Sequence, residues 1–458
     1  MVMTNNFDDT ISAIATVLGT GGVSIIRLSG KNSQEIINKI FFKDKNFLQV
    51  KFSPNSVTHG YIYEEKKLLD EVIVLYFKAP NSYTGENVFE IQCHGGVNIT
   101  KAIFDLTLKN GARIAEKGEF TKRAFLNGKL DLSQAESVLD IISAKTKKFA
   151  QESANNLCGK LAMKIREIRE QVIDLLSHIV AAIDFPEEVE EPDYTAISEE
   201  ISSIMKNIDE ILKCSKNSNL LRQGVKIAIA GKPNVGKSSL FNNILNYERA
   251  IVTDIAGTTR DTISENIDLN GIPATITDTA GIRKISNSTD ANKIENIGIE
   301  FSKRSIEEAD IVVFLTDLST PPTQEDEIIS EIVKKKKHII AGTKADLPRT
   351  NTKFQTDINI SNKDRSGLNE LMNNISNTVS SDIEMSETEF FTNERQQEAL
   401  EQAKLSLQKA FESASMMAEQ DFIAIDIKSA LMHLGEITGD DVTQEIINNI
   451  FEKFCIGK

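Results

Sequence analysis

The sequence predicts a multidomain protein of mixed class: an N-terminal α/β domain, an all-α domain split in sequence, and a second α/β domain inserted into it. Three observations support this prediction. The 458 residues exceed the size at which one hydrophobic core stops growing, so roughly two to four domains are expected. Helical periodicity occurs in two separate stretches, and the chain between them alternates strand, turn and helix.

The composition, with 40% apolar and 26% charged residues, is that of an ordinary soluble protein. No stretch approaches the roughly 18 uninterrupted apolar residues of a membrane span, and the first residues, MVMTNNFDDT, lack a signal-peptide pattern. We therefore expect a cytoplasmic protein. The net charge of −15 would repel a polyanion over most of the surface. Contact with nucleic acid would need a local patch or a partner.

The four cysteines are scattered without a paired spacing, at Cys93, Cys158, Cys214 and Cys455. This arrangement argues against a zinc site and against a disulfide framework. In the first 125 residues, apolar runs such as VSIIRL (23–28) and EVIVLYF (71–77) alternate with turns that contain Gly and Asn. Residues 1–125 are therefore predicted to form an α/β or α+β domain.

Helical periodicity begins near Leu130. SQAE (133–136) has the form of a capping box, with Ser at the cap and Glu three residues later. Apolar residues then recur at steps of four and three, which predicts a long amphipathic helix packed on other helices. DFPEEVEEPD (184–193) ends it with two prolines and a dense acidic run. A further helix is expected over 195–214, and polar KNSNLLRQG (216–224) leads out. The apolar positions are Leu161, Ile165, Ile168, Val172, Leu175 and Ile179.

Residues 223–380 show the repeated strand, turn and helix pattern of a parallel sheet wrapped by helices. The predicted strands are VKIAIA (225–230), ATITD (274–278), IVVFLTD (311–317), HIIAG (338–342) and DINIS (357–361). Helical periodicity then returns, with apolar residues at Ile427, Leu431, Leu434, Ile446, Ile450 and Phe454. The simplest organisation assigns 126–222 and 381–458 to one discontinuous helical domain and 223–380 to the inserted domain.

The inserted domain carries a phosphate-binding loop. GKPNVGKSS, beginning at Gly231, matches GxxxxGK[ST] between an apolar strand and the helix SSLFNNIL (238–245), which is the context this motif requires. Backbone N–H groups would wrap the phosphates, Lys237 would reach the β- and γ-phosphates, and the Ser238 hydroxyl would ligate magnesium. The alternative is a glycine-containing turn before a helix that binds no phosphate. It does not explain why the strand, the Lys-Ser pair and the helix occur together.

Two switch-type motifs follow. In TDIAGTTRD (253–261), Thr259 is placed to give magnesium a second protein hydroxyl. DTAG (278–281) ends a strand, so Asp278 would hold the hydrated magnesium and the Gly281 amide would meet the γ-phosphate. Each motif would be weak alone.

Base choice is assigned to TKAD (343–346), because the Asp346 carboxylate can accept from N1–H and the exocyclic amine of guanine, a donor pair that adenine lacks. SNK (361–363) would present backbone amides to the guanine oxygen. The ordered set predicts a Ras-like GTPase domain. The predicted GTP-binding residues are Asn234, Val235, Gly236, Lys237, Ser238, Ser239, Thr253, Asp254, Ile255, Ala256, Gly257, Thr258, Thr259, Asp278, Thr279, Ala280, Gly281, Thr343, Lys344, Ala345, Asp346, Ser361, Asn362 and Lys363.

The sequence departs from common GTPases at two positions. Thr343 replaces the usual Asn of Asn-Lys-x-Asp, which contacts the base and steadies the phosphate loop, so we expect somewhat weaker guanine binding without loss of specificity. Ile282 stands where Ras-like proteins place a water-orienting Gln, and an aliphatic side chain cannot take that role. In the following segment (281–300), Glu295 is the candidate general base, and a solvated helix face is the alternative explanation for it.

These motifs, with others outside the GTPase elements, resemble the MnmE (TrmE) family of tRNA-modification GTPases over essentially the whole chain. The further motifs are DTISAIAT (9–16), GGVSIIRLSG (21–30), YTGENVFEIQCHGG (83–96), GEFTKRAFLNGKLDLSQAE (118–136), DFPEE (184–188) and CIGK (455–458). The resemblance implies an N-terminal domain that binds tetrahydrofolate and dimerises, a split helical domain, and an inserted Ras-like domain.

The resemblance also implies an activity. With the flavoprotein MnmG, the family adds an aminomethyl-type group, such as carboxymethylaminomethyl, to C5 of the wobble uridine of certain tRNAs. A one-carbon unit comes from 5-formyl- or methylene-tetrahydrofolate. Homodimers and a heterotetramer with MnmG are therefore expected, and no membrane association. Carried onto this chain, the family's folate contacts fall on Arg27, Glu90, Lys129 and Lys458, each of which has a surface charge or an ion pair as its alternative.

The family's GTPase domains pair in the presence of potassium, which takes the place of an arginine finger. The potassium ligands fall on Asn234, Thr253, Ile255 and Thr258, and the catalytic glutamate falls on Glu295. Cys455 lies in the C-terminal motif, where a role in the modification and an inert packed thiol are equally open. Val17 and Leu18, where the family carries proline, and the polar insertion 286–292 depart from the family pattern.

Two other functional classes of GTPase are alternatives to a tRNA-modifying enzyme. A ribosome- or RNA-associated GTPase switch would use its nucleotide state to time RNA docking, and VLGTGG (17–22) contains a GxxG as KH domains do. The run lacks the lysine-rich surroundings of such a clamp. A GTPase scaffold with a decayed folate site would have lost the folate positions, but the sequence retains them.

Overall fold

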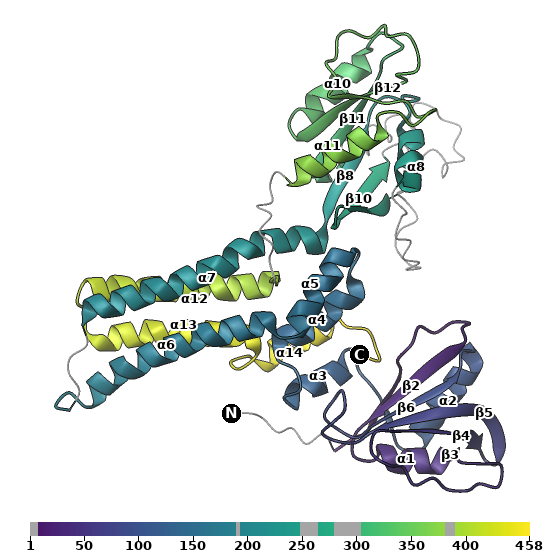
Figure 1. Cartoon of the computed structure of the whole chain (residues 1–458), viewed down its shortest axis with the longest axis vertical. Helices are drawn as coiled ribbons and strands as arrows, with labels where there is room; N and C mark the ends of the chain where they lie inside the picture. The colour runs from purple at the N-terminus through teal and green to yellow at the C-terminus, as the bar shows by residue number, and fades with distance from the viewer. Residues whose placement is uncertain (1–7, 189–192, 248–263, 279–303, 381–389) are drawn as a thin grey trace. The chain divides into compact units, whose positions relative to one another are not determined.

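The computed structural model describes residues 8–188, 193–247, 264–278, 304–380 and 390–458 (Figure 1). The chain divides into two compact units. Unit 1 comprises Met1–Leu139, Leu157–Ile201 and Gln402–Lys458, and unit 2 comprises Asp140–Asn156 and Ser202–Glu401. The three-domain division expected from the sequence remains a prediction. No helix in the described part of the chain is long and apolar enough to cross a membrane.

The N-terminal part of unit 1 is a seven-stranded sheet in the order β3-β4-β5-β6-β2-β1-β7. The pairing is antiparallel except for the parallel pair of β1 and β7. The strands are β1 (Ile11–Ile14), β2 (Val23–Ser29), β3 (Phe41–Phe42), β4 (Ser56–Glu64), β5 (Lys67–Phe77), β6 (Val88–His94) and β7 (Arg113–Ile114). The strands expected at 23–28 and 71–77 are confirmed within β2 and β5.

Helices α1 (Ser33–Ile40) and α2 (Val97–Lys109) bury apolar side chains against this sheet. The strands alternate accordingly, because successive side chains of a strand point to opposite faces. In β6, Phe89, Ile91 and Cys93 are buried, whereas Glu90 and Gln92 lie on the other face. The second face is therefore the one that displays polar groups, including Glu90.

The remaining helices of unit 1 begin with α3 (Glu119–Leu126) and α4 (Leu132–Ser143). The capping box predicted at SQAE (133–136) was wrong by two residues. The Asp131 carboxylate accepts from the Gln134 backbone N–H at 3.0 Å, and the Gln134 side-chain oxygen accepts from the Asp131 N–H at 2.9 Å. Asp131 forms the reciprocal bonds because it directly precedes the first helical residue, Leu132, whereas Ser133 lies inside the helix and donates to the Asp131 carboxylate.

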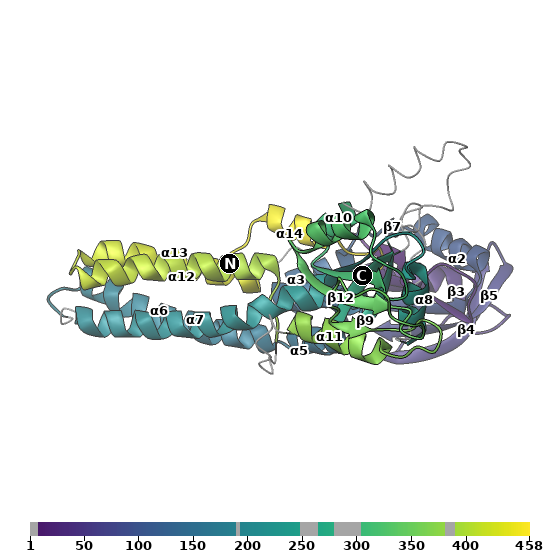
Figure 2. The same cartoon turned by 90° about the horizontal axis from the view of Figure 1, so that it is seen from above.

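The long amphipathic helix expected from the sequence is α6 (Lys160–Asp184), and all six of its predicted apolar positions are buried. It ends at Asp184, immediately before the Phe-Pro pair, as predicted. α13 (Gln420–Thr438) packs beside α6, as both Figure 1 and Figure 2 show. α14 (Gln444–Phe451) follows with Thr443 as its N-cap.

Two long helices, α7 (Tyr194–Gln223) and α12 (Glu394–Ser415), have residues in both units. α7 corrects the prediction of a helix over 195–214 with a polar exit at 216–224. The helix continues because Ser218 and Leu221 are buried, and it stops at Gly224, whose φ of 78° breaks the helical path.

Unit 2 contains a six-stranded sheet in the order β13-β12-β11-β8-β10-β9. Its pairing is parallel except that β9 runs antiparallel to β10. The elements are β8 (Val225–Ala230), α8 (Lys237–Tyr247), β9 (Ser264–Leu269), β10 (Ile272–Asp278), β11 (Ile311–Asp317), α10 (Gln324–Val333), β12 (Lys337–Thr343), β13 (Ile358–Asn359) and α11 (Leu368–Ser380). α5 (Lys147–Leu157) also belongs to this unit over most of its length.

The five predicted strands of unit 2 are confirmed, and the expectation of a purely parallel sheet is corrected by β9. Sequence reasoning missed this strand. β9 and β10 are joined by Asn270 and Gly271, with φ values of 54° and 93°. An Asn-Gly pair with positive φ at both residues is the preferred two-residue hairpin turn. That dipeptide between Leu269 and Ile272 was the available signal.

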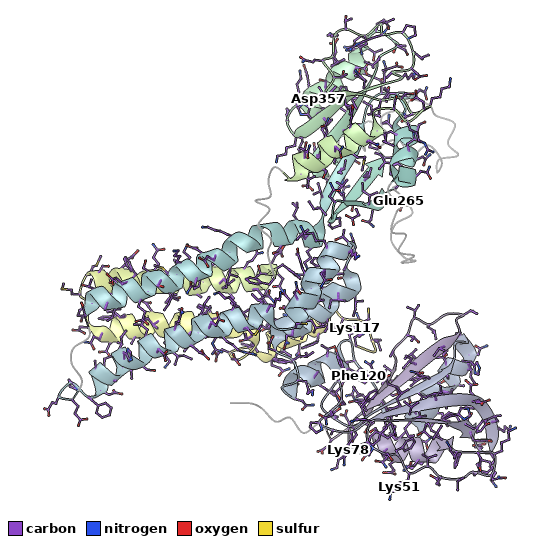
Figure 3. All side chains as sticks on the ribbon, in the orientation of Figure 1. Lys51, Lys78, Lys117, Phe120, Glu265 and Asp357 are labelled. Carbon is purple, nitrogen blue, oxygen red and sulfur yellow. The ribbon has the colours of Figure 1, made fainter. Side chains whose placement is uncertain are left out.

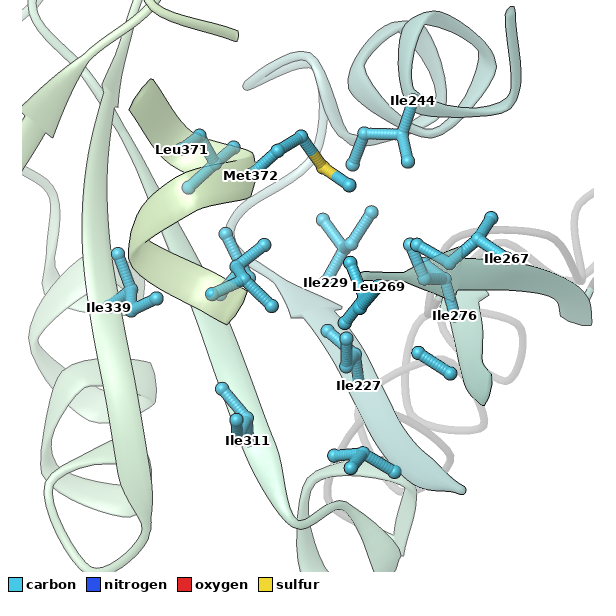
Figure 4. Packing of buried hydrophobic residues seen from close by; sticks show 14 of the residues in the cluster. Ile227, Ile229, Ile244, Ile267, Leu269, Ile276, Ile311, Ile339, Leu371 and Met372 are labelled. Carbon is cyan, nitrogen blue, oxygen red and sulfur yellow. The ribbon is translucent and has the colours of Figure 1, made fainter. Parts of the chain in front are cut away.

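The core of unit 2 lies between one face of the sheet and the helices α8 and α11. Figure 4 shows Ile227 and Ile229 of β8 and Ile276 of β10 facing Ile244 of α8 and Met372 of α11. β11 is buried along its whole length. A central strand covered on both faces reads as a continuous apolar run, as IVVFLTD does. The core fixes the ends of β8, β10, β11 and β12 relative to one another.

Candidate functional site

The phosphate-binding loop connects β8 to α8. Gly231 has a φ of 152°, and a Cβ there would lie 2.7 Å from the Leu315 carbonyl oxygen, so only glycine fits. Asn234 adopts φ 61° and is exposed. Lys237 is buried, and its ammonium donates to the carbonyl oxygens of Gly231 (2.6 Å) and Lys232 (2.8 Å). These bonds hold the positive charge over the loop, where a phosphate would be bound.

Two side chains that were predicted to lie at the magnesium ion, those of Ser238 and Asp278, are in contact. Ser238, at the start of α8, donates from Oγ to Asp278 Oδ2 at 2.8 Å. Asp278 is the last residue of β10, and β10 pairs with β8 so that Asp278 lies beside Ile229. A hydroxyl and a carboxylate are hard oxygen donors of the kind that magnesium prefers. The residues present therefore fit a magnesium ion.

The base-reading residues lie at the ends of β12 and β13. The Thr343 hydroxyl is fully buried and donates to the Val235 carbonyl at 2.8 Å, with the Thr316 carbonyl at 3.3 Å. Thr343 thus contacts the phosphate loop, one of the two roles expected of the Asn it replaces. The Ala345 N–H donates to the Ile360 carbonyl at 3.1 Å, which ties TKAD to the SNK segment. Asp346 is exposed at the same edge.

Lys344 adopts φ 59° and donates to Asp317 Oδ2 at 2.6 Å. Asp317 ends β11 and is almost completely buried. Burial disfavours its ionised form, but hydrogen bonds from Lys344 and Ser319 outweigh this and hold the pKa of Asp317 below its ordinary value. An ionised Asp317 therefore fixes the direction of the Lys344 side chain.

Several predicted site residues lie outside the described residues. These are Thr253, Asp254, Ile255, Ala256, Gly257, Thr258 and Thr259 of the first switch motif, Thr279, Ala280 and Gly281 of DTAG, Ile282 and Glu295. Their roles stay predictions. The structure brings together the phosphate loop, Asp278, TKAD and SNK.

A second group of predicted residues meets in unit 1. Arg27 of β2 and Glu90 of β6 are register partners, and Arg27 Nε donates to Glu90 Oε1 at 2.8 Å. The Arg27 guanidinium also lies 5.5 Å from the ring centroid of Tyr83 and 5.6 Å from that of Phe120. Two aromatic rings and a carboxylate thus orient Arg27. Phe120 in α3 is labelled in Figure 3.

The C-terminal segment joins this group. The Gly457 carbonyl accepts from Arg27 at 3.4 Å, and the Lys458 carbonyl accepts from the Phe120 N–H at 3.2 Å. Burial lowers the pKa of the Lys458 ammonium, the charge of Arg27 lowers it further, and Glu90 opposes the shift. Lys458 therefore lies close to Arg27 and Glu90. Cys455 is exposed beside this segment.

Lys129 occupies a different position in this region. Its ammonium donates to the Pro80 carbonyl at 3.2 Å, and its side chain passes over Gly85, where a Cβ would lie 3.3 Å from Lys129 Cγ. Pro80 and Gly85 belong to the segment that carries Tyr83. Lys129 thus contacts the same segment that lies against Arg27. Among the described residues, no hydrogen bond joins Lys129 to Arg27, Glu90 or Lys458.

Arg123, which sequence reasoning did not single out, contacts the same segments of the chain as this group. Its guanidinium is fully buried and lies 2.7 Å from Asp9 Oδ1, 2.9 Å from Glu119 Oε1 and 3.2 Å from Glu86 Oε1. Arg113 reaches Glu119 at 2.6 Å. The network ties the start of the chain, the segment of Tyr83 and the first turn of α3 together. An arginine inside GEFTKR offered no signal that separated it from a surface charge.

Comparisons with known proteins cover the same parts of the chain. A family model described as "GTP-binding protein TrmE N-terminus" matches residues 10–129, and one described as "MnmE helical domain" matches residues 132–455. The protein named tRNA modification GTPase MnmE from Thermoanaerobacter pseudethanolicus is 45% identical over 464 residues, covering 98% of this chain and 99% of that protein. The chain belongs to the MnmE family of tRNA modification GTPases.

Another MnmE, from Clostridioides difficile, is 42% identical over 461 residues, with 98% and 99% of the two chains covered. Among solved structures, Era from Aquifex aeolicus is similar over 40% of this chain and 66% of its own, at 24% identity and a TM-score of 0.26. The FeoB G-domain from Methanococcus jannaschii covers 34% of this chain and 97% of its own, at 22% identity and a TM-score of 0.24. Scores this low support no inference of their own.

For this MnmE-family chain, the family model of the N-terminus spans Arg27, Glu90 and Lys129, and that of the helical domain reaches Cys455. Sequence reasoning missed Asp317, Tyr83 and Phe120 as parts of the two sites. A signal existed for Asp317 alone, because a carboxylate that follows a buried strand lies at the edge where the neighbouring parallel strands also end. Tyr83 and Phe120 meet Arg27 only through tertiary packing.

Proposed function

We propose that this chain is a potassium-activated GTPase that, together with the flavoprotein MnmG, adds a (carboxymethyl)aminomethyl group to C5 of the wobble uridine of certain tRNAs. Membership of the MnmE family supports GTP hydrolysis in tRNA modification. The single observation that carries the GTPase part is the convergence of Lys237, Ser238 and Asp278 at the ends of β8 and β10, beside the TKAD segment at the end of β12.

In this proposal the loop amides and Lys237 bind the β- and γ-phosphates, and Asp346 selects guanine. Ser238 and Asp278 would hold magnesium, which supplies charge neutralisation on the phosphates when it is bound. Asn234 is exposed in the left-handed conformation, so its side chain is accessible to a cation. Thr253, Ile255 and Thr258 would complete the potassium site, and Glu295 would accept the proton of the attacking water.

The folate part of the proposal rests on Arg27, Glu90 and Lys458. Glu90 presents a carboxylate that can accept from a pterin amine, while Arg27 offers donors whose direction is fixed by Tyr83 and Phe120. Burial and Arg27 lower the pKa of Lys458, so an anionic partner such as a folate carboxylate would stabilise its ammonium form. Lys129 would extend this surface along the Tyr83 segment.

Exposed apolar side chains on the N-terminal sheet and on α13 are the candidate surfaces for partner binding. The face of the N-terminal sheet opposite α1 and α2 exposes Val23, Val57 and Ile73, by 59%, 68% and 40%. These exposed apolar side chains, set among the polar groups of the same face, favour association with a second copy, as the proposed homodimer requires. On α13, Phe422 and Ile425 are 57% and 64% exposed, and they offer apolar area for a protein such as MnmG. With a net charge of −15, tRNA binding would depend on a local patch or on that partner.

Two measurements test the proposal. GTP hydrolysis by the full chain is expected to be far faster in KCl than in NaCl at equal ionic strength, because Ile282 replaces the water-orienting Gln and Asn234 of the loop is accessible to a cation. Equal rates in the two salts would refute potassium activation. The measurement is repeated with CsCl. Because Cs⁺ is larger than K⁺, this separates a general salt effect from potassium binding.

Calorimetry with 5-formyltetrahydrofolate tests the folate site. We expect saturable binding by the wild-type chain and loss of binding by Arg27→Ala, with Lys109→Ala on the far end of α2 as a surface control. A flat titration of the wild-type chain would favour the alternative function, an RNA-associated GTPase switch without modification chemistry.

A further inference from the structure

Two side chains from the base-reading segments bond to consecutive carbonyls of the phosphate loop. The Thr343 hydroxyl donates to the Val235 carbonyl at 2.8 Å. The Asn362 side-chain amide donates to the next carbonyl, that of Gly236, at 3.2 Å. The two bonds come from different segments, TKAD and SNK, which follow different strands of the sheet. Both segments are therefore fastened to the loop immediately before Lys237.

The orientation of the Asn362 amide is fixed by a third residue. Asn243 of α8 donates from Nδ2 to the Asn362 backbone carbonyl at 3.1 Å and to Asn362 Oδ1 at 3.3 Å. With Oδ1 accepting from Asn243, the Asn362 NH₂ group is directed at Gly236. The approach is close, since a Cβ on Gly236 would lie 2.8 Å from Asn362 Nδ2. A residue other than glycine at position 236 would displace this amide.

The Thr343 hydroxyl supplies fewer donors to the loop than an asparagine side chain at the same position would. A threonine hydroxyl has one hydrogen to donate, and here it is directed at Val235 with the Thr316 carbonyl also within reach. An asparagine amide has two. At position 343 one donor is therefore available to hold the phosphate loop against the base-reading edge of the sheet, and Asn362 supplies another from the neighbouring segment.

We propose that Asn362 is a positioning residue for the bound guanine nucleotide, forming with Thr343 a clamp on the Val235 and Gly236 carbonyls. Because the clamp holds these two carbonyls on one side of the loop, the backbone N–H groups of the loop stay directed at the phosphates. It also fixes the distance between the phosphate loop and the guanine-reading segment. The proposal rests on the GTP site proposed above, and it assigns the Asn362 side chain a role beyond its backbone amide.

Release of a fluorescent GDP analogue (mant-GDP) from the full chain, followed by stopped flow, tests the clamp. Loss of one neutral hydrogen bond that orders a binding loop corresponds to about a 3- to 10-fold change. Asn362→Ala is therefore expected to release GDP about 3- to 10-fold faster than the wild-type chain. Asn243→Ala is expected to have a smaller effect in the same direction. Asn373→Ala, an exposed asparagine on α11, is the matched control and should leave release unchanged.

A rescue variant separates positioning from general damage. Thr343→Asn adds an amide donor at the other arm of the clamp, so Thr343→Asn combined with Asn362→Ala should recover most of the slow release. The unfolding temperature of the nucleotide-free chain is measured for each variant. If Asn362→Ala lowers that temperature and leaves GDP release unchanged, Asn362 is only structural and the clamp is wrong. Failure of the rescue would likewise refute a shared role of the two residues.

The wild-type chain distinguishes failure of the proposed GTP site from failure of the clamp. If it does not bind the GDP analogue at all, the proposed GTP site fails, and the clamp fails with it. If it binds the analogue and Asn362→Ala releases it at the wild-type rate, the GTP site stands and only the clamp is refuted.

Discussion

Replacing Arg123 is expected to destabilise unit 1 strongly. The guanidinium is fully buried and contacts three carboxylates, those of Asp9, Glu86 and Glu119. Arg123→Met retains an extended side chain of similar length but removes the charge. Glu119, whose side chain is only 7% exposed, would then keep Arg113 as its remaining cationic partner among the contacts described here.

The expected loss of stability follows from the contacts that the carboxylates keep after Arg123 is replaced. Removing one partner of a buried ion pair typically destabilises a protein by about 3–5 kcal/mol. Arg113 still lies 2.6 Å from Glu119 and 2.7 Å from Asp9, and the Asp9 side chain is 43% exposed and partly hydrated. We therefore expect a loss near the lower limit, about 3 kcal/mol. For a unit of this size, about 2–4 °C per kcal/mol gives a decrease in Tm of about 6–12 °C.

The assay is urea unfolding of the full chain with hydrogen exchange of the 113–126 segment, which assigns the change to unit 1. Lys122→Met is the control, because Lys122 neighbours Arg123 in α3 but makes a surface hydrogen bond to Asn448. Arg123→Met should also weaken 5-formyltetrahydrofolate binding, since the network holds α3 and the Tyr83 segment against Arg27. A destabilisation no larger than that of Lys122→Met would refute the reasoning.

The same network predicts a pH dependence. Burial opposes ionisation of Asp9 and Glu119, but hydrogen bonds from Arg113 and Arg123 outweigh it, so the pKa values of both carboxyls are lowered. A carboxyl with a lowered folded-state pKa stabilises the fold fully above its unfolded pKa of about 4. This contribution is lost as the pH falls through the lowered value. Unfolding of the 113–126 segment should therefore become easier below about pH 4 in the wild type, and less steeply so in Arg123→Met.

Three further predictions concern single side chains. Asp317→Asn removes the charge that holds Lys344, so GDP affinity measured by fluorescence titration should fall about 3- to 10-fold, while unchanged affinity would contradict the orienting role of Asp317. Glu90→Gln keeps the size of the side chain but not the charge that pairs with Arg27, so calorimetry should show folate binding weakened at least about 10-fold, and wild-type binding would remove Glu90 from the site. Glu295→Ala should abolish GTP turnover in a phosphate-release assay while GDP affinity stays near normal, and retained turnover would exclude Glu295 as the base.

The nucleotide-binding elements were predictable because their signals are local. VKIAIA, the GxxxxGK[ST] loop and IVVFLTD each combine a buried apolar strand with a fixed spacing of polar residues, and β8 and β11 have the predicted bounds. A parallel sheet then places every strand end at one edge, so the order of the motifs predicts their convergence. This is why the side chains of Ser238 and Asp278, far apart in sequence, meet at one edge of the sheet.

The residues of the proposed folate site and the ion network could not be found in this way. Arg27 and Glu90 face each other through the register of β2 and β6, which no local pattern in either strand specifies. Arg123 is separated from Asp9 by more than a hundred residues. The resemblance to a family supplied Arg27 and Glu90 but not Arg123, since a residue that only positions others leaves no chemical signature in the sequence.

Thr343 shows why one departure from a motif cannot be interpreted alone. From the sequence, Thr in place of Asn predicted somewhat weaker guanine binding. In the fold, the Thr343 hydroxyl still reaches the Val235 carbonyl, and Asn362 bonds to the adjacent Gly236 carbonyl. If Asn362 compensates, Thr343→Asn should bind GDP within about twofold of the wild-type affinity, because the added amide repeats a bond that the clamp already provides. Binding about tenfold tighter would mean that the compensation is incomplete and that the prediction from the sequence was right.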